Sequence, residues 1–525
     1  MRASSVMRDA DVLTVVGHRT VADVLRAGAE RTPDRTLLVF DDLDGGAQEF
    51  TWEDVLERST AIAGALAGAG VFPGDHVHLH LPNRPEFLFH WFGCALRGAV
   101  MVPTNVASSV AELAYILRHV GAVLSVTDGD GRDTVREARD VAGLGGEVWR
   151  CEADLPSPPD GHPAEAAISD GGPLSDLAVM YTSGTTSRPK GVRVTHANYV
   201  FAGESVAAGL GLVPDDRFLV VLPLFHANAQ YYSVMSALVT GATVVLASRF
   251  SASGWVDTAI RHQATVASLF AAPIRMILAK ESRPHWRSHR LRVVAFAQNL
   301  TPAEQTAWDR GIGAPLLQLY GMTETIGPPL MNPLHGERRH DSLGRVVLGY
   351  RCRITDRDGA AVRPGEAGEL RVAGVPGVSL MAGYLKDPET TAEVMGDGWL
   401  KTGDLVREDP DGLISFVTRA KDMIKRAGEN IAAGEIEDVL MEHPSVIDAA
   451  VIGVPDAMRD ETIVAFVVTA EGDIDDEALR AWCADRLAQF RVPEFFAGRT
   501  ALPRTSVGKI QKQVLREEWS AAADG

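Results

Sequence analysis

The stretch Tyr181-Thr-Ser-Gly-Thr-Thr-Ser-Arg-Pro-Lys190-Gly191 says most about the fold of this chain. Its glycine, Gly184, permits a tight turn in which backbone N–H groups approach an anion. Arg188 and Lys190 add positive charge. The apolar run Leu177–Tyr181 before it predicts a buried strand. Its hydroxyl side chains can each donate a hydrogen bond to a phosphate oxygen: Thr182, Ser183, Thr185, Thr186 and Ser187. The stretch therefore predicts a phosphate-binding loop that leaves a strand.

Two other kinds of loop share part of this pattern. A surface loop rich in Ser, Thr and Gly would have the same composition without binding anything. A Walker loop is excluded, because it needs Ser or Thr directly after Gly-Lys, and here Lys190 is followed by Gly191. The remaining motifs of the chain decide between a phosphate-binding loop and a plain surface loop.

Short apolar runs alternate with helical patterns outward from this loop, which is typical of α/β chains with parallel sheets. The predicted strands are Ala99–Pro103, Ala122–Val126, Leu177–Tyr181, Phe218–Leu222, Ala242–Leu246 and Val293–Phe296. The segment Thr20–Ala69 predicts a helix, a strand pair and a second helix.

Past residue 350, short β segments with Asp-Gly turns predict a small β subdomain. The last hundred or so residues predict a small α+β unit with helices at Ala432–Glu442 and Asp476–Gln489. We therefore expect an N-terminal domain over residues 1–418 with parallel and mixed sheets flanked by helices. A small mobile C-terminal domain over 419–525 follows, with a hinge near Lys421 and Asp422.

Composition limits the classes of partner. A net charge of −18 argues against nucleic acid and anionic membranes as main partners. The N-terminus carries no apolar run of signal length, and the four scattered cysteines predict reduced thiols. We expect a cytoplasmic protein without stable membrane association, and self-association as a homodimer is left open.

Several residues beyond the loop suggest a site. Glu324, in Tyr320-Gly-Met-Thr-Glu324, is a suitable Mg²⁺ ligand by type, although Thr323 could simply cap a helix there. Asp404 and Arg419 could hold a ribose, while an Asx-turn is the alternative for Asp404. Lys509 follows Gly508 and could be an ordinary solvated lysine.

The histidines His76, His78 and His80 alternate along one predicted strand, which raises the question of a metal site. No carboxylate or cysteine stands nearby at ligand spacing. We therefore favour a strand at the edge or boundary of the core over a metal centre.

Together, Thr182–Gly191, Tyr320–Glu324, Thr402–Asp404, Arg419–Gly428 and Pro503–Lys509 resemble the adenylate-forming superfamily of acyl-CoA synthetases, luciferases and adenylation domains. The resemblance covers about Thr20 to Lys512. It is closest to the carnitine/crotonobetaine-CoA ligase group, on features such as Asp422-Met-Ile-Lys-Arg-Ala-Gly-Glu-Asn430.

The resemblance implies ATP and CoA as co-substrates and Mg²⁺ bound by Glu324. Asp404 and Arg419 would hold the ribose, Gly428 would line the thiol tunnel, and Lys509 would reach the acyl carboxylate and the α-phosphate. It implies catalytic roles for Thr182, Lys190, His226, Glu324 and Lys509. The nucleotide-binding set that it implies is Thr182, Ser183, Gly184, Thr185, Thr186, Lys190, Gln298, Asn299, Tyr320, Gly321, Met322, Thr323, Asp404, Arg419, Lys425 and Gly428.

For the acid, the resemblance points to polar residues around His226, which could instead be an ordinary turn histidine. Ala297-Gln-Asn-Leu300 replaces the small Gly-Ala-Pro type of adenine loop, which predicts a polar pocket wall. The expected acid-site residues are His226, Asn228, Gln230, Tyr231, Gln298 and Asn299.

These residues are more polar than a long-chain fatty-acid tunnel requires. We expect an AMP-forming acid–thiol ligase for a small polar or aromatic acid. The alternative is an adenylating enzyme that passes an activated acid to an amine or a carrier protein, or that activates an unusual acid. A non-enzymatic nucleotide-binding protein is disfavoured, because Lys190, Glu324, Asp404, Arg419 and Lys509 are all present.

Overall fold

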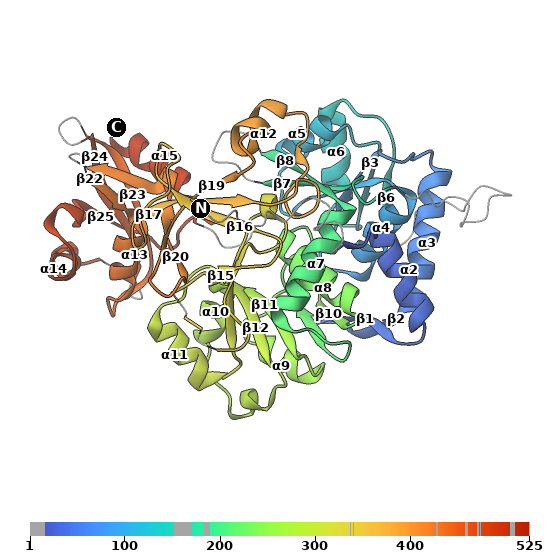
Figure 1. Cartoon of the computed structure of the whole chain (residues 1–525), viewed down its shortest axis with the longest axis horizontal. Coiled ribbons are helices and arrows are strands. Elements are labelled where there is room, and N and C mark those ends of the chain that lie inside the picture. The colour runs from blue at the N-terminus through green and yellow to red at the C-terminus, as the bar shows by residue number, and fades with distance from the viewer. Residues whose placement is uncertain are drawn as a thin grey trace, which may run out of the picture. The chain divides into compact units, whose positions relative to one another are not determined.

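The computed structural model describes residues 16–151, 171–182, 189–336, 338–339, 341–426, 429–456, 460–469, 472, 474–504 and 510–523. The chain forms two compact units, one from 1–352 with 372–400 and the other from 353–371 with 401–525 (Figure 1). The predicted α/β class with a large N-terminal and a small C-terminal part is confirmed. The predicted boundary at 418/419 and the hinge stay predictions.

The first unit contains a seven-stranded sheet that carries the predicted phosphate loop. Its inner strands β7, β4, β3, β5 and β6 run parallel, so their carboxyl ends share one edge of the sheet, while β8 turns back antiparallel to β7. In sheet order the strands are β18 (Gly383–Tyr384), β8 (Lys190–Thr195), β7 (Asp176–Thr182), β4 (Val100–Pro103), β3 (His76–His80), β5 (Leu124–Thr127) and β6 (Val148–Arg150).

A nine-stranded sheet also belongs mainly to the first unit. Six adjacent strands, from β13 to β1, are parallel, and antiparallel strands flank them at both ends. The sheet order is β15 (Arg345–Val346), β14 (Leu330–Met331), β13 (Leu316–Tyr320), β12 (Val293–Ala297), β11 (Val266–Phe270), β9 (Arg217–Val220), β10 (Thr243–Ala247), β1 (Thr36–Asp42) and β2 (Gly46–Thr51).

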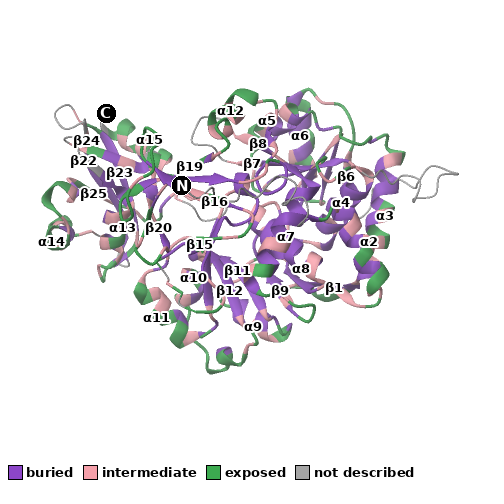
Figure 2. Cartoon of the chain, viewed as in Figure 1, coloured by how far each residue is buried: buried purple, intermediate pink, exposed green. Residues whose placement is uncertain are grey.

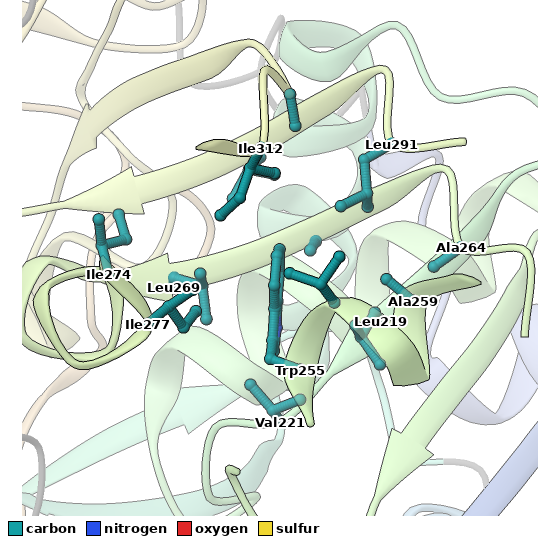
Figure 3. Close-up of a cluster of buried hydrophobic side chains, with 14 of the residues drawn as sticks. Leu219, Val221, Trp255, Ala259, Ala264, Leu269, Ile274, Ile277, Leu291 and Ile312 are labelled. Carbon is teal, nitrogen blue, oxygen red and sulfur yellow. The ribbon is translucent and has the colours of Figure 1, made fainter. Parts of the chain in front are cut away.

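One face of this sheet carries a dry core. Figure 3 shows Trp255 among Leu219, Val221 and Leu269, and Trp255 is only 1% exposed. Its ring centroid lies 5.8 Å from that of Trp308, another buried indole. Near-complete burial of such large apolar side chains fixes the strands against their helices. Figure 2 shows the same contrast, with purple buried strands such as β11 and β12 and green exposed surface on α11 and α12.

The helices of the first unit begin where the sequence supplies a capping box. This holds for α2, α3, α5, α7 and α11. In each of them the Ser or Thr side chain at the N-cap accepts from the N–H of the third helical residue, and the Asp, Glu or Asn side chain of that third residue accepts from the N-cap N–H. The helices are α2 (Val21–Arg31), α3 (Trp52–Gly68), α4 (Pro85–Arg97), α5 (Val110–Val120), α6 (Arg132–Ala142), α7 (His196–Leu210), α8 (Met235–Thr240), α9 (Trp255–Arg261), α10 (Ala271–Leu278), α11 (Pro302–Gly311) and α12 (Pro388–Met395).

The second unit holds most of a four-stranded sheet and all of a five-stranded one. The first has the order β16 (Arg351–Thr355), β17 (Ala367–Ala373), β19 (Leu400–Glu408), β20 (Ile414–Arg419). The second consists of β22 (Glu429–Ala432), β21 (Met423–Arg426), β24 (Asp460–Thr469) and β23 (Val446–Asp456), with β25 (Phe495–Gly498) beside β24. Helices α13 (Ala433–Met441), α14 (Asp476–Arg486) and α15 (Lys512–Ala523) complete it.

The predicted helix Asp476–Gln489 is three residues too long. Leu487 has an extended backbone, φ −121° and ψ 151°, and its N–H bonds back to the Cys483 carbonyl. In this extended conformation, just after the end of the helix, the Leu487 side chain packs against the core of this unit. A side-chain periodicity cannot reveal such an ending, because the tertiary contact decides it.

All four cysteines are free thiols, as predicted, and three of them are buried. Within the described residues, no helix is long and apolar enough to cross a membrane.

Candidate active site

The ends of the predicted phosphate loop are fixed by an antiparallel hairpin. β7 and β8 pair so that Thr182 lies opposite Lys190, and the loop connects these two residues. The Tyr115 hydroxyl donates to the Pro189 carbonyl over 3.1 Å, and the Leu385 N–H donates to the Gly191 carbonyl over 2.8 Å. Residues 183–188, which include Ser183, Gly184, Thr185 and Thr186, lie outside the described residues. Their predicted phosphate contacts stay predictions.

Glu324 lies on a three-residue 3₁₀ helix, Thr323–Thr325, directly after β13. The possibility that Thr323 caps a helix is wrong, because Met322 occupies the N-cap position of this turn. The Met322 N–H donates to the Thr325 hydroxyl oxygen over 2.9 Å. The Glu324 side chain is buried, 6% exposed, and its backbone carbonyl accepts from the Met381 N–H. The carboxylate therefore has a fixed place beside the segment that carries β18.

Tyr384 links Glu324 to the phosphate loop. Its hydroxyl donates to Glu324 Oε1 over 2.9 Å, and Lys190 Nζ lies 5.2 Å from the centre of its ring. Burial, followed by the charge of Glu324, raises the pKa of Tyr384, so the phenol stays protonated and remains a donor. One side chain thus contacts both the predicted metal ligand and the predicted loop lysine.

Sequence reasoning missed Tyr384. It lies on β18, which pairs Tyr384 with Val192 of β8. Nothing in the local pattern around Gly383-Tyr384 indicates a contact with a residue sixty positions earlier. Only the arrangement of strands brings the two together.

The turn after β13 packs against an unusual helical segment. Residues Asn228–Val234 form a π-helix, a rare form that is frequent at functional sites. A Cβ atom added to Gly321 would lie 2.2 Å from the Tyr232 hydroxyl, so a side chain at that position would displace the phenol. Burial, then nearby groups that include Glu324, raise the pKa of Tyr231 well above its usual range. The π-helix and the Glu324 turn therefore adjoin.

The acid-site candidates on this segment differ in what their side chains do. Gln230 is fully buried; its Oε1 accepts from the Tyr199 hydroxyl over 2.5 Å and its Nε2 donates to the Leu224 carbonyl over 2.6 Å. These bonds hold the Gln230 amide among neighbouring residues, and its predicted contact with the acid stays a prediction. Asn228 Oδ1 accepts from the Ser268 hydroxyl over 2.9 Å. Within the described part of the chain, the buried Asn228 Nδ2 and Tyr231 hydroxyl have no partner.

His226 lies in the turn before the π-helix. Its N–H donates to the Pro223 carbonyl, and its own carbonyl accepts from the Gln230 N–H. The ring centre lies 4.4 Å from that of Phe225. The turn geometry is thus present, while the predicted role beside the acid carboxylate stays a prediction.

Gln298 and Asn299 form the predicted polar loop after β12. Gln298 has a positive φ of 79°, which is unusual for a residue with a side chain. Gln318 holds the loop, since its Nε2 donates to the Gln298 carbonyl over 3.2 Å and to Asn299 Oδ1 over 2.8 Å. Arg275 also donates to the Asn299 carbonyl. The sequence predicted the polar character of this loop, whereas the positive φ of Gln298 and the bonds from Gln318 are found only in the structure.

Asp404 and Arg419 face each other across β19 and β20. They are register partners, and Arg419 Nε lies 3.2 Å from Asp404 Oδ1. The Asx-turn alternative for Asp404 is wrong, because the residue lies inside a strand and its side chain is only 5% exposed. Lys425 lies on β21, where its N–H donates to Glu461. Gly428 and Lys509 lie outside the described residues.

Among the described residues, no group of three or more His, Cys, Asp or Glu side chains around β3 could hold a metal ion. The predicted position of the strand at the edge or boundary of the core is wrong. β3 is flanked by β4 and β5, and His78 and His80 are almost fully buried. Thr104 Oγ1 lies 2.8 Å from His78 Nε2 and 2.9 Å from His80 Nδ1. Burial, then nearby positive groups, holds the pKa of His78 well below its usual value. These imidazoles are interior hydrogen-bonding groups.

Comparison with known proteins identifies the family. The model for AMP-binding enzymes matches residues 25–385, and the model for the C-terminal domain of AMP-binding enzymes matches residues 435–509. The chain belongs to the AMP-binding enzyme family. It is an adenylate-forming enzyme of the acyl-CoA ligase class, as the resemblance implied.

The relatives support this assignment. A crotonobetaine/carnitine–CoA ligase of Salmonella choleraesuis (strain SC-B67) is 38% identical over 92% of this chain and 96% of its own. The anthranilate CoA ligase AuaEII in complex with anthranoyl-AMP has a TM-score of 0.87 at 26% identity, over 96% and 98% of the two chains. The o-succinylbenzoate CoA synthetase of Bacillus subtilis with ATP and a magnesium ion has a TM-score of 0.82 at 29% identity, over 94% and 98%.

A magnesium ion accompanies ATP in this family, and the residues here fit one. Mg²⁺ prefers one or two carboxylates together with phosphate oxygens. Glu324 supplies a buried carboxylate that is oriented by a phenol, the kind of supporting hydrogen bond that metal-ligating carboxylates usually have. Glu324 could therefore hold the ion, and Tyr384 would position its carboxylate; the predicted role of Glu324 as metal ligand stays a prediction.

Replacing Tyr384 with phenylalanine tests this positioning role. Loss of a hydrogen bond that orients a metal ligand typically weakens metal affinity by about 10-fold or more. We expect Tyr384→Phe to raise by about that factor the Mg²⁺ concentration that supports half-maximal ATP binding, measured by calorimetry without acid. Tyr115→Phe, which removes another phenol in contact with the same hairpin, serves as the control. An unchanged Mg²⁺ dependence in Tyr384→Phe would assign Tyr384 to packing alone.

Proposed function

We propose that the protein activates a small polar or aromatic carboxylic acid and joins it to CoA. The acid's carboxylate oxygen bonds to the α-phosphorus of ATP, and the bond to the β-phosphate breaks to release pyrophosphate. The CoA thiol then bonds to the acyl carbon, loses its proton, and AMP leaves. Catalysis of this kind depends on positioning and on stabilising charge at the reacting phosphorus.

The choice of acid rests on Asn228. Its Nδ2 is a buried donor without a partner among the described residues, while its Oδ1 is held by Ser268. A buried, unpartnered donor costs free energy, about 1–3 kcal/mol, so it favours a ligand that supplies an acceptor. A simple alkyl chain offers none. The acids named for the relatives, anthranilate and o-succinylbenzoate among them, carry polar groups or an aromatic ring.

Each step is assigned to its own set of residues. Thr182, Lys190, Glu324 and Tyr384 would serve the phosphates and the metal, and Asp404 with Arg419 would hold the ribose. Lys509 would stabilise the charge that develops between the acid carboxylate and the α-phosphate. The paired Asp404 and Arg419 support the ribose role, because a fixed carboxylate is a suitable acceptor for hydroxyl groups.

A panel of acids tests this proposal. Pyrophosphate release would be followed with small polar acids, benzoate-type acids and long-chain fatty acids, and product masses would be recorded with and without CoA. We expect small polar or aromatic acids to exceed palmitate in kcat/KM by about tenfold or more, since an unmatched buried polar group costs roughly that much. Preference for palmitate would contradict the proposed acid class. An acyl product on an amine or carrier protein, with no CoA thioester, would contradict the proposed acceptor.

A further inference from the structure

A pocket in the first unit lies away from the residues assigned above. It has a volume of about 500 Å³ and opens beside α6 and β6, which Figure 1 labels on the first unit. That volume is in the range of small-molecule sites. Its walls are formed by Arg132, Arg136, Arg139, Asp140, Leu144, Gly146, Glu147, Val148 and Trp149.

Three arginines reach this pocket from one helix. Arg132, Arg136 and Arg139 are spaced four and three residues apart on α6, so they share one face of it. Asp140 and Glu147 are the acidic groups of the lining, both exposed. Glu147 Oε2 accepts from Trp149 Nε1 over 2.6 Å. Three guanidinium groups against two carboxylates leave a cationic pocket on a chain with a net charge of −18.

Arg139 is the unusual member of this set, because it is charged and only 2% exposed. It donates to Ser125 Oγ over 3.0 Å, to the Val123 carbonyl over 3.4 Å and to the Gly145 carbonyl. All these partners are neutral, and no carboxylate among the described residues pairs with it. Its buried Nε has no partner in that part of the chain either. Burial accordingly lowers the pKa of Arg139.

The groups behind Arg139 do not offset its charge. Ser125 Oγ also contacts His78 Nδ1 over 3.1 Å, and His78 continues through Thr104 to His80. Burial, followed by the neighbouring His80 and Arg139, holds the pKa of His78 well below its usual value. Burial also lowers the pKa of His80 to about 4, so both imidazoles are neutral near pH 7. A buried cation with only neutral partners is costly, and an anion placed against it would relieve that cost.

We propose that this pocket binds a small phosphate-bearing molecule, with Arg136 as its phosphate ligand and the buried charge of Arg139 attracting the anion from behind. Arg136 is exposed, so its parallel N–H groups can match two phosphate oxygens at once, whereas both Nη groups of Arg139 already donate to Ser125, Val123 and Gly145. The pocket is larger than a single phosphate needs, so it has room for an organic body as well. The site is separate from the adenylation chemistry, and the proposal does not depend on which acid the enzyme activates.

Calorimetric titration of the full chain tests this site. The catalytic site is first saturated with α,β-methylene ATP and Mg²⁺, and inorganic phosphate, pyrophosphate and AMP are then titrated separately. We expect saturable binding of at least one probe at one site per chain, and the probe that binds most tightly identifies the source of the phosphate group. Arg136→Gln should weaken that binding at least tenfold, because a charged, two-pronged contact is lost.

Arg310→Gln is the matched control, since Arg310 is also an exposed arginine on a helix and its loss changes the net charge equally. It should leave probe affinity unchanged. Both variants should keep acid-dependent pyrophosphate release in the absence of added probe. The proposal is overturned if no probe gives saturable heat. It is equally overturned if Arg136→Gln binds the probes as tightly as Arg310→Gln does, because the heat then comes from elsewhere.

Discussion

Replacing Glu324 with glutamine is expected to reduce acid-dependent pyrophosphate release by roughly 10²–10³-fold. Glutamine keeps the shape of the side chain and can still accept from the Tyr384 hydroxyl, so the fold around β13 should survive. What disappears is the negative charge that a magnesium ion needs from the protein. Calorimetry should show weaker, less Mg²⁺-dependent ATP binding, and the pyrophosphate assay should show the loss of turnover.

Glu393→Gln provides the control for this substitution. Glu393 is an exposed glutamate of α12, in the same unit, and its replacement removes the same charge. It should leave both ATP binding and turnover within twofold of the unmodified protein, because surface substitutions of this kind have small effects. If Glu324→Gln retained full Mg²⁺-dependent turnover, the assignment of Glu324 as metal ligand would be wrong.

Replacing Lys509 with alanine should also abolish acid-dependent pyrophosphate release, by roughly 10²–10³-fold. The resemblance assigns this lysine to charge that develops on the acyl carboxylate and α-phosphate, which is an interaction of the transition state. Removal of such an interaction lowers kcat and leaves ground-state binding almost intact. ATP affinity, measured without acid, should therefore stay close to that of the unmodified protein.

The acyl-transfer step distinguishes a role of Lys509 in adenylation from a role in thioester formation. When a preformed acyl-adenylate is supplied together with CoA, Lys509→Ala should still form the thioester, since the phosphorus chemistry has already taken place. Lys280→Ala, at an exposed lysine of the first unit, should behave as the unmodified protein in every assay. Full adenylation activity in Lys509→Ala would remove the role assigned to Lys509.

The helices and strands whose ends depend on residues nearby in the sequence could be predicted well. The apolar run Leu177–Tyr181 became the core of β7, and Thr20 with Asp23 marks the start of α2 as a capping box. These signals are local, because a helix cap or a short apolar strand depends on residues within a turn or two. The end of α14 was predicted less well, because Leu487 leaves the helix to reach a core made by distant strands.

The candidate site shows the same division. The sequence indicated Glu324 as a candidate metal ligand, because it is a carboxylate that follows an apolar strand. It indicated Asp404 and Arg419 as candidate ribose-binding residues, and the structure places these two as an ion pair. The resemblance placed Gln230 at the acid, and the structure adds that its amide already bonds to Tyr199 and Leu224. Whether a polar side chain faces a ligand depends on whether other parts of the chain already satisfy it, and sequence spacing does not carry that information.

The sequence by itself determined the family, the α/β class and the residue types of the phosphate loop, because each depends on local order along the chain. The tertiary structure decided that Tyr384 donates to Glu324, that His78 and His80 are interior, and that Arg139 is buried among neutral acceptors. These outcomes follow from strand order. Strands pair through backbone groups that every residue carries, so the side chains that they bring together are set by the packing of the whole unit.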